Sequence, residues 1–126
     1  GDFNIALESR DIHDPEKLTG GIMASEKERD ALKNALGDRL KDAFRLFETG
    51  SNHWSWWNYR NASWERDKGW RIDHIYLSNE LIDQAISCMI FKKTRGHSQP
   101  SDHAPVMVDI QWPPEEEEIE SEFSLF

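Results

Sequence analysis

An aromatic run near the middle of the chain limits the folds available to it more than any other stretch. The run Trp54-Ser55-Trp56-Trp57-Asn58-Tyr59 places four large rings within six positions. Aromatic residues favour β-strands, and neighbouring side chains of a strand point to opposite faces. Rings on both faces need packing partners on both sides. We therefore predict a strand that is covered on both faces, with Trp54 and Trp57 in the core.

The stretch from Trp70 to Leu77 alternates between residue types and predicts a second strand. The alternation assigns two faces, one with Ile72, His74 and Tyr76 and the other with Arg71, Asp73, Ile75 and Leu77. Asp73 would then lie among apolar side chains. Because burying a lone carboxylate is costly, we expect Asp73 to have a partner.

Local signals place the remaining elements. Ser25 and Glu28 form a capping box that starts a helix, and Gly37 supplies a left-handed cap that ends it. The fold class is α/β (α+β), with strands outnumbering helices. The further elements that we predict are a core segment at 40–47, which is either a short helix or a buried connection, a helical turn at 78–81, and strands at 85–91 and 104–110.

The first four residues, Gly1-Asp2-Phe3-Asn4, combine an acid and an amide. Asp2 and Asn4 are two positions apart, and in an extended strand this spacing puts both side chains on one face. Such a pair suits phosphodiester hydrolysis, because the carboxylate orients or deprotonates a water while the amide holds a phosphate oxygen or a metal-bound oxygen. Gly, Asp and Asn also form turns, so the tetrapeptide by itself is more typical of a turn with a capped strand end than of a catalytic edge.

A long polar loop is predicted from Glu8 to Gly21. Asp11, His13 and Asp14 lie within it and carry side chains that ligate metals, but their spacing matches no recognisable ligand pattern. We therefore interpret this part of the loop as a solvated turn.

The net charge of −9 does not exclude a nucleic-acid partner, because six acidic residues are concentrated between residues 115 and 122. An enzyme that binds a polyanion through a groove needs only local positive potential. The residues that we expect to supply this potential are Arg60, Arg66, Lys68, Arg71, Lys92, Lys93, Arg95 and His97.

Cysteine content and hydropathy bear on the cellular compartment. The single cysteine, Cys88, excludes an intramolecular disulfide and favours a reducing compartment. No apolar run approaches membrane-spanning length, and no signal peptide is recognisable. We expect a cytoplasmic monomer without a membrane partner. Because the chain begins at its first motif with Gly1, we also interpret it as a piece of a longer protein.

Four motifs follow one another along the chain: Gly1-Asp2-Phe3-Asn4, Trp54 to Arg60, Gly69-Trp70-Arg71-Ile72-Asp73 and Ser101-Asp102-His103-Ala104-Pro105-Val106. Their order resembles the C-terminal half of the exonuclease III family of apurinic/apyrimidinic endonucleases, within the endonuclease/exonuclease/phosphatase superfamily. The two middle motifs are the narrower ones and indicate DNA. The resemblance implies that residues 1–112 form half of a four-layer α/β sandwich of the DNase I-like type, with a mixed β-sheet flanked by helices.

The resemblance also assigns catalytic roles. Asp2 matches the residue that orients or deprotonates the attacking water, and Asn4 matches the neighbour that binds phosphate. His103, which alone would be typical of a strand end, matches the histidine that contacts the scissile phosphate, and Asp73 matches the acid that hydrogen-bonds it. Asp102 matches a metal-binding acid. The implied cofactor is Mg²⁺ or Mn²⁺, with Asp2, Asn4, Asp102 and His103 as its predicted ligands.

Trp56 and Trp70 resemble the walls of a pocket that receives a flipped abasic sugar. A sugar that lacks its base fits between two rings, whereas an intact nucleotide does not. Arg60 falls where the family inserts a side chain into the duplex, and an ordinary solvated arginine is the alternative. The resemblance therefore implies a DNA repair nuclease that hydrolyses phosphodiester bonds of double-stranded DNA at abasic sites and 3′ ends.

The family's first half, with its main glutamate metal ligand, lies outside this chain, and Asn58 stands where many relatives have Asp. We expect the isolated chain to be inactive or weakly active. Two alternative functions stay open. One is a superfamily phosphatase acting on a lipid or inositol phosphate, and the other is a catalytically incompetent fragment that binds DNA or a sliding clamp.

The last segment, residues 113–126, is predicted to be an acidic disordered tail. Its final Ser-Leu-Phe resembles the peptide with which bacterial proteins bind the sliding clamp, in which apolar side chains fill a pocket. The implied clamp-binding residues are Phe123, Leu125 and Phe126. Glu122 and Phe123 depart from the usual Gln and Leu of that peptide, and a plain disordered tail is the alternative.

Overall fold

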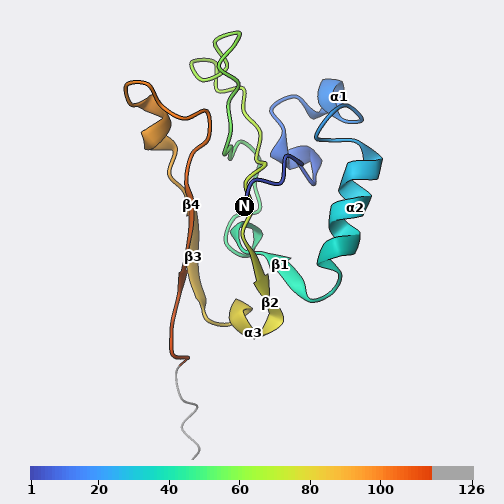
Figure 1. The fold of residues 1–126 in the computed structure, drawn as a ribbon, viewed down its shortest axis with the longest axis vertical. Helices are drawn as coiled ribbons and strands as arrows, with labels where there is room; N and C mark the ends of the chain where they lie inside the picture. The colour runs from blue at the N-terminus through green and yellow to red at the C-terminus, as the bar shows by residue number, and fades with distance from the viewer. Residues whose placement is uncertain (115–126) are drawn as a thin grey trace, which may run out of the picture.

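The computed structural model describes residues 1–114, which form short helices and strands (Figure 1). In this view the N-terminus lies in the middle, with the helix α2 on one side of it and the hairpin of β3 and β4 on the other. In chain order the elements are η1 (Ser9–Asp11), α1 (Pro15–Leu18), α2 (Glu26–Leu36), β1 (Leu40–Asp42), η2 (Phe44–Leu46), β2 (Tyr76–Ser78), α3 (Asn79–Ile82), β3 (Ala85–Ile90), η3 (Lys92–Gly96) and β4 (Val106–Ile110), where η denotes a 3₁₀-helix.

The strands of the described part form two antiparallel pairs. β1 pairs with β2, with Leu40 opposite Ser78, and β3 pairs with β4, with Cys88 opposite Val108. The mixed sheet that the resemblance implies is therefore present in residues 1–114 only as these two antiparallel ladders. The predicted strands at 85–91 and 104–110 are confirmed, within two residues at their ends.

The predicted helix is present as α2, with the predicted caps. The Ser25 hydroxyl accepts a hydrogen bond from the Glu28 backbone N–H at 3.2 Å, and the Glu28 carboxylate accepts one from the Ser25 backbone N–H at 3.1 Å. Gly37 has a φ of +54° at the C-terminal end, a conformation that favours glycine. Both signals act within a few residues, so the sequence predicts this helix well.

Four segments, three of which were expected to be strands or parts of strands, instead meet through isolated bridges. The paired residues are Asp2 with Asp73, Trp56 with Trp70, and Trp56 with His103. The predicted strand at 70–77 is regular only at its end, where β2 runs from Tyr76 to Ser78. Residues 54–59 form no regular strand. The predictions of full strands are wrong, although the isolated bridges place these segments side by side.

The apolar core of the described part is divided among three clusters of buried side chains. Trp54 and Trp57 pack with Ala104, which confirms their predicted core positions. The other clusters are Ala6, Ile12, Ala24, Trp70 and Ile72, and Ala43, Phe44, Leu77 and Cys88. Burial raises the pKa of the Cys88 thiol to about 11.

The segment at 40–47 is only partly core. It forms β1 and η2, and Ala43 and Phe44 are buried, but Leu40, Leu46 and Phe47 are 37%, 40% and 44% exposed. The prediction that the whole segment is core is therefore wrong at these three positions. No helix within residues 1–114 is both long and apolar enough to span a membrane.

A buried ion network joins the first loop to the segment that precedes Asp73. The Arg71 guanidinium donates to Asp11 at 2.7 Å and to Asp42 at 2.5 Å, and Arg45 donates to the same Asp11 at 2.5 Å. Asp11 and Arg71 are 0% and 1% exposed. The interpretation of Asp11 as part of a solvated turn is therefore wrong, because two arginines compensate its buried charge.

This network also corrects the predicted faces and the predicted positive potential. Arg71, Ile72 and His74 are all buried, so residues 71–74 do not alternate between a core face and a solvent face. Arg95 is buried as well, with its guanidinium over the rings of Tyr59 and Trp64. Arg71 and Arg95 therefore do not contribute to a basic DNA-binding surface, as had been expected of them.

Candidate active site

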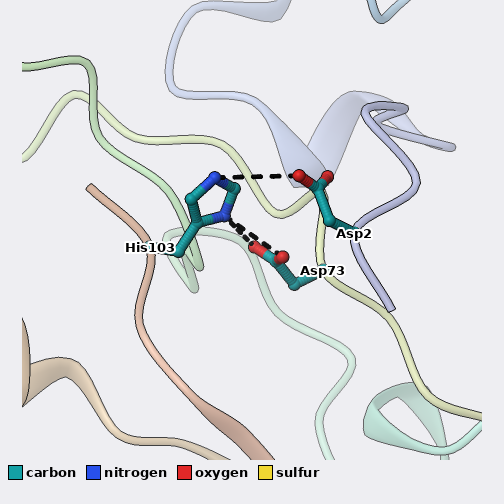
Figure 2. A group of neighbouring side chains, drawn as sticks. All are labelled: Asp2, Asp73 and His103. Carbon is teal, nitrogen blue, oxygen red and sulfur yellow. Dashed lines mark hydrogen bonds and ion pairs between the residues drawn. The ribbon is translucent and has the colours of Figure 1, made fainter. Parts of the chain in front are cut away.

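The structure brings the side chains of Asp2, Asp73 and His103 together, although they come from distant parts of the chain (Figure 2). Nδ1 of His103 lies 2.9 Å and 3.1 Å from the two carboxylate oxygens of Asp73. Nε2 of the same ring faces Asp2, whose Oδ2 is 3.7 Å away. Both ring nitrogens therefore face carboxylates that come from distant parts of the chain.

Backbone pairing sets the two carboxylates side by side. The His74 N–H donates to Gly1 O at 3.0 Å, and the Phe3 N–H donates to Ile72 O at 3.0 Å. Asp2 and Asp73 are thus opposite each other in an antiparallel bridge, where side chains share a face. Like charges directly opposite each other are unfavourable, so this position needs a cation, and His103 faces both acids.

The environment of His103 favours its charged form. Burial by itself lowers the pKa of His103, but the hydrogen bond and the charge of Asp73, together with the charges of Asp102 and Asp2, raise it above its ordinary value. Because the Asp73 carboxylate accepts from Nδ1–H, the neutral ring carries its proton on Nδ1. The expected partner of Asp73 is therefore His103.

Asp102 links the histidine to the aromatic run. The Trp56 indole N–H donates to Asp102 Oδ2 at 2.9 Å, while Asp102 Oδ1 lies 3.9 Å from His103 Nε2. Trp56 also pairs with His103 through a backbone bridge. The indole of Trp56 is thus hydrogen-bonded to an acid that borders the candidate site.

Asn4 does not have the predicted strand geometry. Its φ is +52°, in the left-handed region, and its backbone N–H donates to Asp2 Oδ1 at 3.0 Å. This is a turn in which the acid caps the following backbone. Within residues 1–114, no hydrogen bond joins the Asn4 side chain to Asp2, Asp73 or His103, so the shared face predicted from strand alternation is wrong.

The donor atoms at the centre fit a divalent cation. One ligand atom from each of Asp2, Asp73 and His103 lies within 4.8 Å of the other two. Carboxylate oxygens are the ligands that Mg²⁺ and Mn²⁺ prefer. This group includes two of the residues named as metal ligands, Asp2 and His103, and it contains Asp73 in place of Asn4 and Asp102.

A pocket of about 590 Å³ lies beside the candidate site and is lined by both predicted aromatic residues. Trp56 and Trp70 share it with the basic residues Arg66 and Lys68. Arg60 is exposed on the neighbouring loop and does not line this pocket. The remaining lining residues are His13, Leu18, Gly21, Ile22, Met23, Asn58, Asn61 and Ser63. The predicted clamp-binding residues Phe123, Leu125 and Phe126 lie outside the described part of the chain.

Sequence reasoning missed two features around the site. One is the ion network of Arg71. The other is Ser55, which is 0% exposed and accepts a hydrogen bond from the Asp73 backbone N–H. The charged residues of the network are far apart in the sequence and carry no spacing signal. A serine inside an aromatic run was the only available hint for Ser55.

Comparison with known proteins identifies the family. Residues 1–103 match the Endonuclease/Exonuclease/phosphatase family. The chain is 33% identical to a Bacillus subtilis exodeoxyribonuclease over 111 residues and 30% identical to a Haemophilus influenzae exodeoxyribonuclease III over 118 residues. These matches cover 87% and 88% of this chain but only 42% and 44% of the two relatives.

Solved structures agree with this assignment. The chain is similar to a 3′ phosphatase from Neisseria bound to a product DNA hairpin, with a TM-score of 0.85 and 37% identity. It is also similar to an AP endonuclease from Archaeoglobus fulgidus, with a TM-score of 0.81 and 31% identity. The alignments cover 89% and 87% of this chain and 44% and 43% of those chains. The predicted α/β fold of the DNase I-like type is thereby confirmed.

The chain spans less than half the length of these relatives, and the matching part contains the motifs that the sequence singled out. The chain belongs to the Endonuclease/Exonuclease/phosphatase family, and within that family it resembles the exodeoxyribonuclease III and AP endonuclease proteins.

Proposed function

We propose that this chain supplies the phosphate-reacting half of a DNA repair nuclease that hydrolyses phosphodiester bonds at abasic sites and 3′ ends. The observation that carries the proposal is the position of His103, whose Nδ1 is hydrogen-bonded to Asp73 while Nε2 faces Asp2. An imidazole held at one nitrogen by a carboxylate presents the other nitrogen in a fixed direction. This arrangement suits a group that binds a phosphate.

In the proposed reaction, His103 binds the scissile phosphate. The 3.7 Å between His103 Nε2 and Asp2 Oδ2 is longer than a hydrogen bond, so the Nε2–H is not committed to Asp2. It is therefore able to donate to a phosphate oxygen. Because the pKa of His103 is raised, the ring is more often protonated and stabilises negative charge that develops on that oxygen.

Asp2 is the proposed acceptor for the proton of the attacking water. Its Oδ1 accepts the Asn4 backbone N–H at 3.0 Å, and its Oδ2 faces His103. The hydrogen bond to Asn4 fixes the carboxylate, so that Oδ2 orients a water next to a phosphate held by His103. Asn4 thus supports the site through its backbone, and its side chain is a proposed phosphate ligand.

The proposed cofactor is Mg²⁺ or Mn²⁺. The proposed ligands are the carboxylates of Asp2 and Asp102, with the Asn4 side chain completing the set and Asp73 adjacent. His103 can join them only in its neutral form, in which Nε2 carries a lone pair, so ligation of the ion and donation to the phosphate are alternative roles of this ring. When bound, such an ion polarises the phosphate and stabilises the leaving oxygen. The main glutamate ligand that the resemblance implies would come from the other half of the protein, so this chain by itself should bind the ion weakly.

The proposed substrate is double-stranded DNA. The pocket of about 590 Å³ has a volume typical of ligand sites, and it combines the indoles of Trp56 and Trp70 with the positive charges of Arg66 and Lys68. Aromatic rings beside basic groups bind exposed nucleotides by stacking and by attraction to phosphates. An abasic nucleotide or a frayed 3′ end costs less to extrude than a paired one. The role of Arg60 as an inserted side chain is also a proposal.

The proposal is tested by supplying the missing half. This chain is mixed with a separately produced N-terminal half of the Bacillus subtilis relative, Mg²⁺ and a duplex that carries an abasic-site analogue. We expect little cleavage by either half alone and clear incision by the mixture, which His103→Ala abolishes. Efficient incision by this chain alone would show that the second half is not essential, and no incision by any folded mixture would contradict the nuclease function.

We also propose that the C-terminal tail binds the bacterial sliding clamp. The supporting feature is the pair of large apolar residues, Leu125 and Phe126, that ends an otherwise acidic segment. A peptide of residues 113–126 should bind the clamp, and the peptide with both residues replaced by alanine should not. Equal binding by the two peptides would end this proposal.

A further inference from the structure

The buried hydroxyl of Ser55 is hydrogen-bonded to one short segment of backbone. Its oxygen accepts from the Ile72 N–H and from the Asp73 N–H, both at 3.0 Å. Oγ also lies 3.5 Å from the Trp70 carbonyl oxygen, which is a long distance for donation by a hydroxyl. A serine oxygen has two acceptor positions, so both are engaged by this segment.

The backbone of Ser55 connects the same segment to the histidine segment. The Ser55 N–H donates to the Trp70 carbonyl at 2.9 Å, and the Ser55 carbonyl accepts from the Ala104 N–H at 2.8 Å. Ala104 directly follows His103. Ser55 is therefore hydrogen-bonded to Asp73 through its side chain and to Ala104, the neighbour of His103, through its carbonyl.

The two N–H groups that meet on Ser55 indicate why a hydroxyl is needed at this position. In a regular strand, successive N–H groups point in opposite directions. Those of Ile72 and Asp73 converge on one oxygen, so the backbone departs from regular strand geometry at these two residues. The two N–H groups therefore have no acceptor in a backbone ladder, and the Ser55 hydroxyl replaces it.

We propose that Ser55 is a positioning residue of the site: its hydroxyl fixes the irregular backbone at residues 72 and 73, and its carbonyl fixes residue 104, so that the Asp73 carboxylate meets Nδ1 of His103. This role deepens the proposed nuclease function and rests on it for its catalytic meaning. Within residues 1–114, the Ser55 side chain forms no hydrogen bond with Asp2 or His103.

The proposal makes a distinct prediction for Ser55→Ala and Ser55→Thr. Alanine leaves the Ile72 and Asp73 N–H groups without their acceptor, so this stretch of backbone relaxes and the Asp73 carboxylate moves away from the ring. Threonine keeps the hydroxyl. Loss of the contact between Asp73 and His103 is therefore expected in the alanine variant and not in the threonine variant.

The test uses the tautomer of His103, read from the nitrogen chemical shifts of its ring in this chain without DNA. All variants are compared at one pH at which the ring is neutral. In the unaltered chain the proton should reside on Nδ1, because Asp73 accepts it there. In Ser55→Ala the Nδ1–H form should lose its predominance, and in Ser55→Thr it should be retained.

Cys88→Ala is the matched control, because Cys88 is a small buried residue of a different core cluster. It should lower the thermal midpoint and leave the His103 tautomer unchanged, which separates general loss of stability from loss of positioning. A folded Ser55→Ala chain with the Nδ1–H form intact would overturn the proposal. Should alanine not fold, Ser55→Cys, with its weaker acceptor, takes its place, and failure of both to fold would assign Ser55 to the core instead.

Failure of the positioning role of Ser55 and failure of the proposed nuclease function give different results. If the unaltered chain lacks the Nδ1–H form, the pairing of Asp73 with His103 is absent and both proposals fail. If that form is present and sensitive to Ser55 but the complemented nuclease cleaves no DNA, the positioning role stands and the nuclease function fails.

Discussion

The Nδ1 atom of His103 lies 2.9 Å from a carboxylate oxygen of Asp73, thirty positions earlier in the chain. The hydrogen bond orients the ring, and the negative charge raises the pKa of His103 despite the opposing effect of burial. Both side chains of the pair are only partly buried, and Nε2 of the ring is directed toward Asp2 (Figure 2). The orientation of this imidazole thus depends on Asp73, and its charge depends on Asp73 together with Asp102 and Asp2.

Asp73→Asn should disable the complemented nuclease while preserving its fold. An amide can present a donor to the ring, which favours the wrong tautomer, and it removes the charge that raises the His103 pKa. We expect kcat to fall by about 10²-fold to 10⁴-fold with a smaller change in KM. Single-turnover cleavage of an abasic duplex measures this, and unchanged kcat would contradict the role of Asp73.

His103 should make the stability of the fold depend on pH. Because its pKa is raised in the folded state, the native protein binds this proton more tightly than the unfolded chain does. The stabilisation is complete below the unfolded pKa of about 6.5 and is lost as the pH rises through the higher folded value. Urea unfolding of His103→Gln across this window should lack that loss.

The control for this comparison is His97→Gln, because His97 is exposed and lies on the loop that leads to the site. It should keep the pH dependence of the unaltered chain. Identical pH profiles for His103→Gln and the unaltered chain would contradict the raised pKa.

Asp11→Asn should strongly destabilise the fold. Asp11 is buried between Arg71 and Arg45, and removing one partner leaves buried charge uncompensated, at a cost of about 3–5 kcal/mol. Burial by itself raises the pKa of Asp11, but the charges and hydrogen bonds of the two arginines lower it below its ordinary value. Its stabilisation is therefore present above the unfolded pKa and is lost as the pH falls through the folded value.

Chemical denaturation of Asp11→Asn beside Asp30→Asn checks this prediction, because Asp30 is exposed on α2. The Asp30 variant should unfold within about 0.5 kcal/mol of the unaltered chain. Equal stability of the two variants would mean that the network contributes nothing.

Gly69→Ala should destabilise the fold for steric reasons. A Cβ atom at Gly69 would lie only 2.5 Å from Cβ and Cγ of the buried Trp54. The ring cannot move without disturbing its cluster, so we expect a loss of about 1–3 kcal/mol. Gly96→Ala is the matched control, since its Cβ would meet Trp64 at an ordinary 3.6 Å. Thermal unfolding of both variants measures the difference, and equal midpoints would contradict the tight packing.

Trp56→Ala should weaken binding of DNA that contains an abasic site. Stacking on one indole contributes about 1–3 kcal/mol, so the Kd should rise by about tenfold or more. Trp112→Ala, which removes an indole that is 72% exposed and far along the chain from the pocket, should not change the Kd. Fluorescence anisotropy with a labelled duplex provides the measurement. Indifference to Trp56→Ala would favour the phosphatase alternative, in which no DNA base or sugar enters this pocket.

Local sequence determined the elements whose signals lie within a few residues. The helix α2 is bounded by Ser25, Glu28 and Gly37, which act on backbone groups of the same helix. The strands β3 and β4 follow from two largely apolar runs of suitable length, whereas their antiparallel pairing was visible only in the structure. The motifs that contain Asp2, Asp73 and His103 were recognisable in the sequence for the same reason, because each is a short contiguous string.

Only the tertiary structure decided how those strings meet. Whether Asn4 turns, whether Arg71 is buried and whether residues 54–59 form a ladder depend on partners tens of positions away, such as Asp11 and His103. The alternation of apolar and polar residues and the strand propensity describe an isolated segment. Long-range interactions override them here: the buried ion pair of Arg71 with Asp11, and the Ser55 hydroxyl that replaces a backbone acceptor. The sequence thus named the chemical groups of the site, and long-range hydrogen bonds and packing fixed their distances and directions.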